Sequence, residues 1–255
     1  ILHANHGFEM YSIVSKVVGA VPKKIKEDVN FNLNIENLID QTNDATKVIY
    51  IASPNNPTGT YLSRDQLVKL MNSISKNIIV VIDGAYVEYV QKDDYDKGFS
   101  LTDEYENIIL TRTFSKTYGL AALRVGWCYT SQKIADIINK IKPPFNTTTI
   151  SQSLAIKALE DKEHIENSVK LNSEIKDWFE KELKLLNIKT RQTEGNFTLI
   201  ETSEEEAEKI SNHLMNDGII IRRLNSYNLP NFLRISIGTK EEMNLTVESL
   251  KKFNV

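Results

Sequence analysis

A lysine, two hydroxyl side chains and an arginine lie close together within residues 113–124. The amine of Lys116 can form a Schiff base with a carbonyl compound, which is the characteristic covalent role of a catalytic lysine. Thr113, Ser115 and Arg124 supply hydroxyl and guanidinium donors, the usual ligands of a phosphate group. Taken by itself, Lys116 is better explained as an exposed lysine at a strand-to-helix turn, and Arg124 as a surface arginine. Their co-occurrence favours a site that combines a reactive amine with a phosphate-binding end.

An aspartate ends the apolar run Ile78–Ile82. A buried charge at Asp83 is costly unless a cation or several hydrogen-bond donors face it. The protonated ring nitrogen of pyridoxal phosphate is such a cation, and it needs a carboxylate to stay protonated. Tyr86 could hydrogen-bond the phenolic oxygen of the same cofactor. The alternatives are that Asp83 caps the turn at Gly84 and that Tyr86 is a core residue with a satisfied hydroxyl.

Both groups of residues follow segments that are expected to be strands. Lys47–Ala52 is a short apolar run rich in β-branched residues. Two further apolar runs, Ile78–Ile82 and Ile108–Thr111, lack alternation, as strands covered on both faces do. Helical segments alternate with these runs, which predicts an α/β fold with a mostly parallel sheet and helices on both sides. Ligands of such sheets bind beyond the carboxyl ends of the strands. The residues expected at those ends are Asn56, Asp83, Ser115 and Lys116.

The pattern changes after Pro143-Pro144. Residues from about 151 to 186 form one long helical pattern. Three strand-like segments follow, at Asn196–Glu201, Ile219–Arg222 and Phe232–Ile237. One helix, capped by Ser203, lies between the first and second of these segments, and another, capped by Thr239, follows the third. We therefore expect a large domain over residues 1–144 and a smaller α+β domain over residues 145–255.

Composition excludes several classes of protein. The chain has 255 residues, 25% of them charged, and a net charge of -3, so it lacks the basic surface that nucleic-acid binding needs. No apolar run reaches the roughly 18 residues of a membrane span. The single cysteine, Cys128, cannot form an internal disulfide, which favours a reducing, cytoplasmic compartment. The four histidines have no metal-like spacing.

Three segments resemble the fold type I (class I and II) pyridoxal-phosphate aminotransferases, and within them most closely the histidinol-phosphate aminotransferase branch. The resemblance covers essentially the whole chain in the right order, ending with residues 196–197 and 232–238. The segments are Ser53–Gly59, Asp83–Tyr89 and Arg112–Gly126. It implies a three-layer large domain, a small C-terminal domain and pyridoxal 5'-phosphate as the cofactor.

The resemblance also implies roles for individual residues. Lys116 would bind the cofactor covalently and move a proton between the substrate and the cofactor, while Asp83 would pair with the ring nitrogen. Asn56 and Tyr86 would bond the phenolic oxygen. The residues implied at the phosphate are Thr113, Ser115 and Arg124. Phe8 matches the aromatic residue that stacks on the cofactor ring, although a core position at a helix start is an equal alternative.

Arg234 matches the arginine that receives the anionic group of the substrate, either a carboxylate or the phosphate of histidinol phosphate. Arg222 matches a second phosphate contact of the histidinol-phosphate branch. Bidentate recognition of either anion suits arginine better than lysine. A shift of one residue in the strand register would put Arg223 there instead. Asn196 either contacts substrate or cofactor or satisfies a strand end.

The sequence departs from the family pattern in two places. Gly84 replaces the glutamate that commonly follows the aspartate, which we interpret as local turn chemistry. The family also has, before the segment that matches Ile1, a glycine-containing loop that donates to the cofactor phosphate and a tyrosine that reaches the partner subunit. We therefore expect the N-terminal part of the large domain to be missing from this sequence.

The expected activity is transfer of an amino group between histidinol phosphate and 2-oxoglutarate. A homodimer, a small-molecule amino donor and an oxo-acid acceptor are the implied partners, with no nucleic acid and no membrane. Alternatives within the family are an aminotransferase for aromatic or other amino acids and a decarboxylase resembling threonine-phosphate decarboxylase. The alternative outside enzymes is an inactive fragment or a domain that only packs against a partner.

Overall fold

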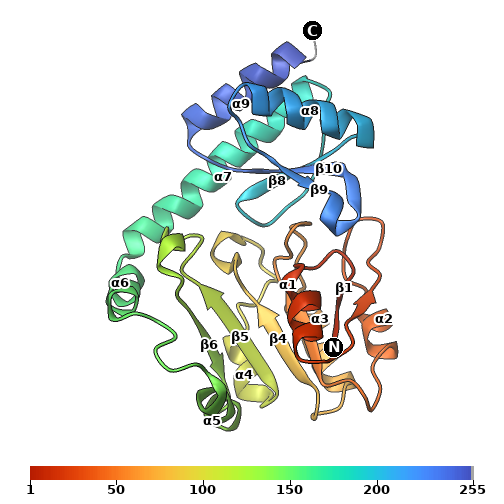
Figure 1. Ribbon diagram of the computed structural model, residues 1–255, viewed down its shortest axis with the longest axis vertical. Helices are drawn as coiled ribbons and strands as arrows, with labels where there is room; N and C mark the ends of the chain where they lie inside the picture. The colour runs from red at the N-terminus through yellow and green to blue at the C-terminus, as the bar shows by residue number, and fades with distance from the viewer. Residues whose placement is uncertain (254–255) are drawn as a thin grey trace.

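The computed structural model describes residues 1–253, which form two units (Figure 1). A six-stranded sheet occupies the N-terminal half of the chain, and a four-stranded sheet with three helices lies above it in the view of Figure 1. In residues 1–253 no helix is both long enough and apolar enough to cross a membrane.

The six-stranded sheet has the order β2-β1-β3-β4-β5-β6. Its strands are β1 (Leu2–Ala4), β2 (Lys23–Ile25), β3 (Val48–Ala52), β4 (Ile79–Asp83), β5 (Ile108–Thr113) and β6 (Gly126–Thr130). Strands β1 to β5 are parallel to one another, and only the edge strand β6 is antiparallel, to β5. The prediction of an α/β fold with a mostly parallel sheet is therefore confirmed.

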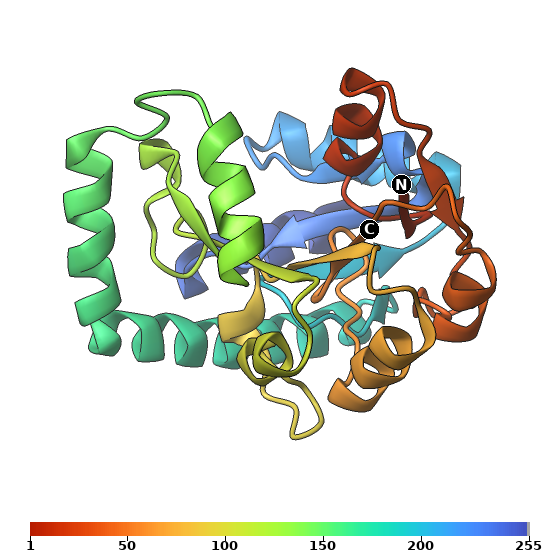
Figure 2. The same cartoon turned by 90° about the horizontal axis from the view of Figure 1, so that it is seen from below.

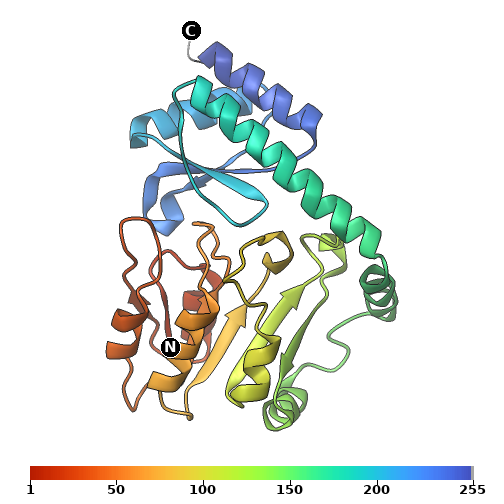
Figure 3. The same ribbon diagram turned by 180° about the vertical axis from the view of Figure 1, so that it is seen from behind.

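Helices lie on both faces of this sheet but cover them unequally. One face packs against α2 (Ile35–Asp40), α3 (Arg64–Ser73) and α4 (Phe99–Glu104), and the other carries α1 (Met10–Val17) (Figures 1 and 3). The main core lies under the first group of helices. Its fully buried members include Ile49, Leu70, Val80, Leu101 and Leu110.

Strand β3 shows the consequence of this unequal cover. Ile49 and Ile51 are buried towards α2 and α3, whereas Tyr50, on the opposite face, is only half-buried. The two faces of β3 are therefore covered unequally, with the deeper burial on the side of α2 and α3. The half-covered face is the one on which α1 places its side chains against the ends of the strands.

Local signals explain where the helices begin. Ser63 and Gln66 form the predicted capping box at α3, and Ser203 and Glu206 form one at α8 (Glu204–Asn216). The remaining helices of the first half are α5 (Gln132–Ile141) and the short 3₁₀ turns Val87–Tyr89 and Ala121–Leu123.

The four-stranded unit has the strand order β7-β8-β10-β9. Its strands are β7 (Lys189–Arg191), β8 (Phe197–Glu201), β9 (Arg222–Leu224) and β10 (Leu229–Ser236), with a 3₁₀ turn at Asn225–Tyr227. The third strand begins at Arg222, three residues after the predicted Ile219. Helices α7 (Lys162–Leu185), α8 and α9 (Lys240–Phe253) share a core with the sheet that includes the buried Phe179 and Leu233.

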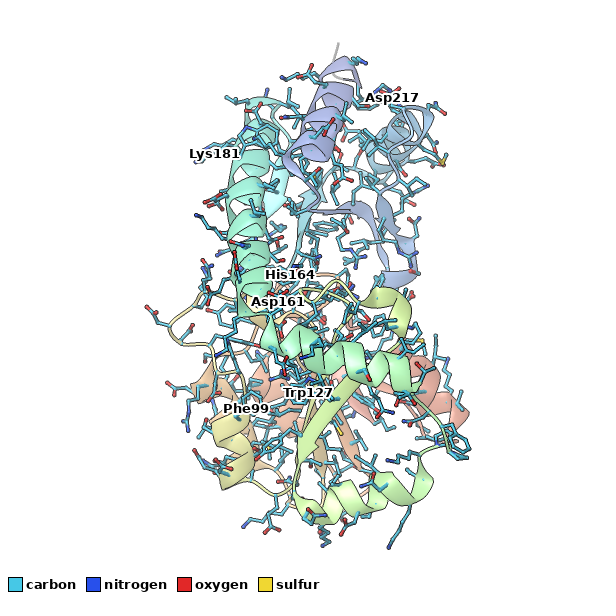
Figure 4. All side chains as sticks on the ribbon, turned by 90° about the vertical axis from the view of Figure 1, so that its left-hand side faces the viewer. Phe99, Trp127, Asp161, His164, Lys181 and Asp217 are labelled. Atoms are coloured by element: carbon cyan, nitrogen blue, oxygen red, sulfur yellow. The ribbon has the colours of Figure 1, made fainter. Side chains whose placement is uncertain are left out.

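The long helical pattern predicted for residues 151–186 is two helices. It breaks at Asp161, where α6 (Thr149–Glu160) ends and α7 begins in a new direction (Figure 2). The Asp161 carboxylate accepts from the backbone N–H of His164 at 3.0 Å and caps α7, and both residues lie at the start of that helix in Figure 4. Ala155 of α6 packs with Phe114 and Val125 of the first unit. The domain boundary near residue 144 stays a prediction.

The two units meet tightly at Gly59. Its carbonyl oxygen accepts from the backbone N–H of Glu194 at 2.8 Å, and its φ is +75°, in the left-handed region. A Cβ atom on Gly59 would lie 2.6 Å from the Cα of Thr193. Glycine is therefore required here by conformation and by space.

We expect Gly59→Ala to lower the free energy of unfolding by about 1–3 kcal/mol more than Gly218→Ala does. Gly218 is a matched control because its φ is +80° and a Cβ atom added there would have nothing within 4 Å. Both changes carry the left-handed penalty of roughly 1–2 kcal/mol, but only the first forces the units apart. Urea unfolding followed by circular dichroism measures the difference. Equal losses would contradict the tight contact at Gly59.

Candidate active site

The carboxyl ends of β3, β4 and β5 bring the predicted residues together. These strands are adjacent, with Ala52 opposite Asp83 and Asp83 opposite Thr111. The loops that follow them carry Asn56, Tyr86 and Lys116, and they face β8 and β10 of the second unit. The candidate site therefore lies between the two units, at the edge of the sheet where the sequence placed it.

Asp83 is a partly buried carboxylate at the end of β4. Burial raises its pKa, and hydrogen bonds from the Tyr11 hydroxyl, the Ala85 N–H and the Thr111 hydroxyl oppose that shift, as does the charge of Arg112. The Tyr11 hydroxyl lies 2.8 Å from Oδ2. Within residues 1–253 no ion pair involves Asp83. Such a carboxylate is well placed to accept a cationic N–H.

Lys116 lies at the mouth of this arrangement. Partial burial lowers the pKa of its amine, and the charge of Arg234 lowers it further. The amine nitrogen lies 5.2 Å from the centre of the Tyr86 ring, which is buried and packs edge-on against Phe197 at 5.5 Å. A lysine with a lowered pKa is more often unprotonated at neutral pH, and the unprotonated amine is the nucleophile.

The phosphate-binding residues predicted from sequence also lie together. A guanidinium nitrogen of Arg124 donates to the Ser115 hydroxyl at 3.3 Å and to the Ala121 carbonyl at 2.7 Å. The Ser115 N–H donates to the Thr113 hydroxyl at 3.0 Å. Arg124 is exposed and has a left-handed backbone, with φ of 48°. Exposed donors from one loop are suited to an anion such as a phosphate.

Arg234 reaches across from β10 to the first unit. Its guanidinium donates to the Asn56 side-chain oxygen and lies 5.3 Å from the centre of the Phe197 ring. Arg234 Nε is buried and has no hydrogen-bond partner within residues 1–253. The guanidinium therefore keeps donor capacity that an anionic ligand can use.

The strand register decides between the two candidate arginines of β9. Arg222 is directly opposite Arg234, so the two side chains share one face of the sheet. Arg223 is opposite the buried Leu233 and points towards Glu208, 3.5 Å away. Arg222 is thus the residue that lies beside Arg234.

Two other predicted residues are placed less tightly. Phe8 is 37% exposed and meets the Tyr11 ring edge-on at 5.8 Å, so its ring is partly accessible. Asn196 precedes β8, and its backbone carbonyl accepts from the Ile237 N–H at 2.9 Å. The backbone bond satisfies the strand end and leaves the role of the Asn196 side chain a prediction.

Gly84 has a packing reason beyond turn chemistry. A Cβ atom there would overlap the guanidinium of Arg112 and lie 2.5 Å from a methyl of Val87. That guanidinium is buried and bonded to the Thr111 and Lys97 carbonyls, and it lies 5.6 Å from the centre of the Phe99 ring. Trp127 flanks Phe99, and both rings are labelled in Figure 4. Arg112 occupies the space that a longer residue at position 84 would need.

Two residues near the site were not predicted from sequence. Tyr11 bonds Asp83, and Tyr227 is buried where the charges of Glu9, Arg234 and Arg222 act on its hydroxyl. Burial raises the pKa of Tyr227. Tyr11 follows Phe8 by one helical turn, and that spacing was the signal available in the sequence.

Comparison with known proteins agrees with this geometry. Residues 1–250 match the family model described as aminotransferase class I and II. The chain belongs to this family. It is 40% identical to the histidinol-phosphate aminotransferase of Pelagibacter ubique over 258 aligned residues, covering 100% of this chain and 71% of the relative.

Solved structures share the fold. The histidinol-phosphate aminotransferase of Clostridium acetobutylicum superposes with a TM-score of 0.92 at 22% identity, covering 99% of this chain and 77% of that one. The Sinorhizobium meliloti histidinol-phosphate aminotransferase, solved with pyridoxal 5'-phosphate, gives 0.91 at 24% identity, covering 99% and 71%. The chain is thus an aminotransferase of the mainly parallel α/β fold that the sequence predicted.

The residues present fit the cofactor of this family, pyridoxal phosphate. The cofactor is an aromatic cation at its ring nitrogen and an anion at its phosphate, with a carbonyl carbon between them. The site offers a partly buried carboxylate at Asp83, anion donors at Ser115 and Arg124, and an amine of lowered pKa at Lys116. Each of the three chemical needs is matched by a side chain of this chain.

We expect Arg234→Gln to raise the pKa of Lys116, because removal of a nearby positive charge favours the protonated amine. The pH dependence of the rate at which an amine reagent modifies Lys116 in the cofactor-free protein measures this pKa, with peptides resolved by mass spectrometry. The wild-type midpoint should lie below the ordinary lysine value of 10.5. Arg223 lies on the opposite face of the sheet, so Arg223→Gln should leave the pKa of Lys116 unchanged. A wild-type midpoint at or above the ordinary value would refute the assignment.

Proposed function

We propose that this aminotransferase is a pyridoxal-phosphate-dependent histidinol-phosphate aminotransferase, which exchanges amino groups between histidinol phosphate and 2-oxoglutarate. The observation that carries the substrate assignment is the pairing of Arg222 with Arg234 on one face of the second sheet. Two adjacent guanidinium groups suit a dianionic phosphate better than a single carboxylate. The name of the Pelagibacter relative supports the same substrate.

Each end of the cofactor has residues to hold it in this proposal. Thr113, Ser115 and Arg124 bind the phosphate, and the Asp83 carboxylate accepts the hydrogen bond of the ring N–H. Phe8, whose ring is partly accessible, stacks on the cofactor ring. When bound, pyridoxal phosphate supplies an electron sink for the negative charge left at the substrate α-carbon after proton removal.

Asn56 and Tyr86 bond the phenolic oxygen of the cofactor. Asn56 is oriented for this by Arg234, which occupies its side-chain oxygen and leaves its NH₂ group free to donate. Tyr86 stays protonated, because burial raises its pKa. Both side chains therefore present donors to an oxygen that carries negative charge.

Lys116 holds the cofactor covalently and then carries the proton. Its amine has a lowered pKa, which favours the unprotonated form that can accept a proton. The positive charge of Arg234 contributes to that shift. Arg234, which binds the substrate anion in this proposal, thus also favours the unprotonated form of Lys116.

The substrate alternatives remain within the same family. An aminotransferase for aromatic or other amino acids would need Arg234 for one carboxylate but would make little use of Arg222. A decarboxylase acting on threonine phosphate would share the phosphate contact but release carbon dioxide. An inactive fragment or packing domain would have no use for an amine of lowered pKa beside a partly buried carboxylate.

We also propose that the protein acts as a homodimer in the cytoplasm. Helix α1 and its C-cap residue leave apolar side chains exposed, among them Ile13, Val17 and Val18, and a second copy is the occupant expected for this family. The single cysteine of the chain is consistent with a reducing compartment. Sedimentation of the cofactor-loaded protein as a 29.1 kDa species would contradict the dimer.

We expect the purified chain to gain visible absorbance when pyridoxal phosphate bonds covalently to Lys116. Lys116→Ala should abolish that band, because alanine has no amine, while leaving the fold intact by circular dichroism. Lys184→Ala is the matched control, since Lys184 lies in the last turn of α7, and it should retain the band. Absence of the band from the wild-type chain would favour the inactive-fragment alternative.

We expect Arg222→Gln to raise the KM for histidinol phosphate about tenfold, which corresponds to ~1.4 kcal/mol, with a much smaller effect on the KM for glutamate. The charge-assisted bonds to phosphate are lost, whereas Arg234 still binds a carboxylate. Steady-state assays with each amino donor measure both values, with Arg223→Gln as the control. Activity of the wild type on aromatic amino acids alone would overturn the substrate assignment.

A further inference from the structure

The hydroxyl of Tyr11 is hydrogen-bonded directly to the partly buried carboxylate of the site. It donates to Asp83 Oδ2 at 2.8 Å, although the two residues are 72 positions apart in the chain. Tyr11 is only 6% exposed. It lies on α1, on the half-covered face of the sheet, and no role for it follows from the phosphate, lysine or substrate contacts described above.

The ring of Tyr11 is held in place from several sides. It stacks in parallel on Tyr50 of β3, with centroids 4.7 Å apart and an interplanar angle of 2°. Phe8 and His3 meet it edge-on at 5.8 Å and 6.0 Å. The backbone carbonyl of Tyr11 accepts from the Ser15 hydroxyl at 2.5 Å. A ring fixed in this way can aim its hydroxyl with little loss of rotational entropy.

The electrostatic setting keeps the proton on Tyr11. Burial and the neighbouring Asp83 raise the tyrosine pKa well above its ordinary value, so its hydroxyl is a permanent donor. Tyr50 and Tyr86 also face it and act in the same direction. Burial raises the pKa of Asp83, and the bond from Tyr11 is the largest of the effects that oppose this rise.

The other groups that face Asp83 come from neighbouring elements. Thr111 donates its hydroxyl from β5, Ala85 donates its N–H from the following turn, and Arg112 contributes its charge from β5 without a direct contact. Tyr86 lies in the loop after β4, where burial raises its pKa and the charge of Asp83 raises it further. Of these groups, Tyr11 is the donor whose hydroxyl can be deleted without changing the size or stacking of its ring.

We propose that Tyr11 is a positioning residue, whose hydroxyl holds the Asp83 carboxylate in the orientation and ionised form that the ring nitrogen of pyridoxal phosphate requires. The inference rests on the proposed role of Asp83 in binding that cofactor. Tyr11 acts through Asp83 and is not assigned any contact with the substrate. A bond to a charged group in a buried position is among the stronger hydrogen bonds of a protein.

The first test measures cofactor affinity. Tyr11→Phe should raise the dissociation constant of pyridoxal phosphate about tenfold, the ratio expected for loss of one charge-assisted hydrogen bond. Tyr50→Phe is the matched control, because it removes a hydroxyl from the partner ring of the same stack, and it should change the constant by less than about twofold. Equal effects of the two variants would overturn the proposal.

A double-mutant cycle shows whether Tyr11 acts through Asp83. In the Asp83→Asn background the cofactor ring nitrogen has no carboxylate partner, so Tyr11→Phe should change the dissociation constant by less than about twofold. A tenfold effect that persists in this background would mean that Tyr11 acts by another route, and the proposal would fail.

The second test uses the cofactor-free protein and is independent of the proposed function. A carboxyl whose folded-state pKa is raised opposes folding above that pKa, and the penalty vanishes below the unfolded value of 3.8. Tyr11→Phe raises the folded-state pKa further. The urea midpoint of Tyr11→Phe, relative to Tyr50→Phe, should therefore fall more at pH 7 than at pH 4.

The two tests separate the possible failures. If the wild type does not bind pyridoxal phosphate, the proposed function fails, while the pH-dependent difference in urea midpoint can still support the bond between Tyr11 and Asp83. If the wild type binds the cofactor but Tyr11→Phe binds it equally well, the proposed function stands and the positioning role is overturned. A midpoint difference that is the same at pH 7 and pH 4 would also overturn it.

Discussion

Asp83, a partly buried carboxylate that has no ion-pair partner within residues 1–253, is the constraint on which the rest of the site depends. Asp83 ends a strand whose other residues are apolar, and burial raises its pKa. Such a group is costly unless donors surround it and a cation completes the pairing. The bonds from Tyr11 and Thr111 supply part of that compensation. The ring nitrogen of pyridoxal phosphate would supply the remainder, so cofactor binding and the stability of the site are linked.

The two units of the fold contribute different residues to the site around Asp83. The six-stranded sheet supplies Asp83 and Lys116 from adjacent strand ends, and the four-stranded sheet supplies Arg234 and Arg222 from paired strands. Arg234 joins the units, because it bonds Asn56 and its charge also lowers the pKa of Lys116. The guanidinium of one unit is therefore coupled electrostatically to the lysine amine of the other.

The sequence predicted the parts of the site that depend on strand ends and motif spacing. Asp83 and Lys116 follow apolar runs, and adjacency of parallel strands brings them together without further information. Tyr11 was missed because it stands in an apolar helical pattern, where its hydroxyl has no visible partner until the helix is placed on the sheet. The choice between Arg222 and Arg223 required the register with β10. The break at Asp161 was missed because a capping aspartate fits within a helical pattern.

We propose that Asp83 keeps the cofactor ring nitrogen protonated. Nitrogen-15 NMR of the protein loaded with pyridoxal phosphate labelled at that nitrogen measures the protonation state directly. We expect a pyridinium signal in the wild type that persists above the pH at which the free cofactor loses its ring proton, and a shift towards the unprotonated pyridine signal in Asp83→Asn. A wild-type signal that already corresponds to unprotonated pyridine at neutral pH would contradict the account.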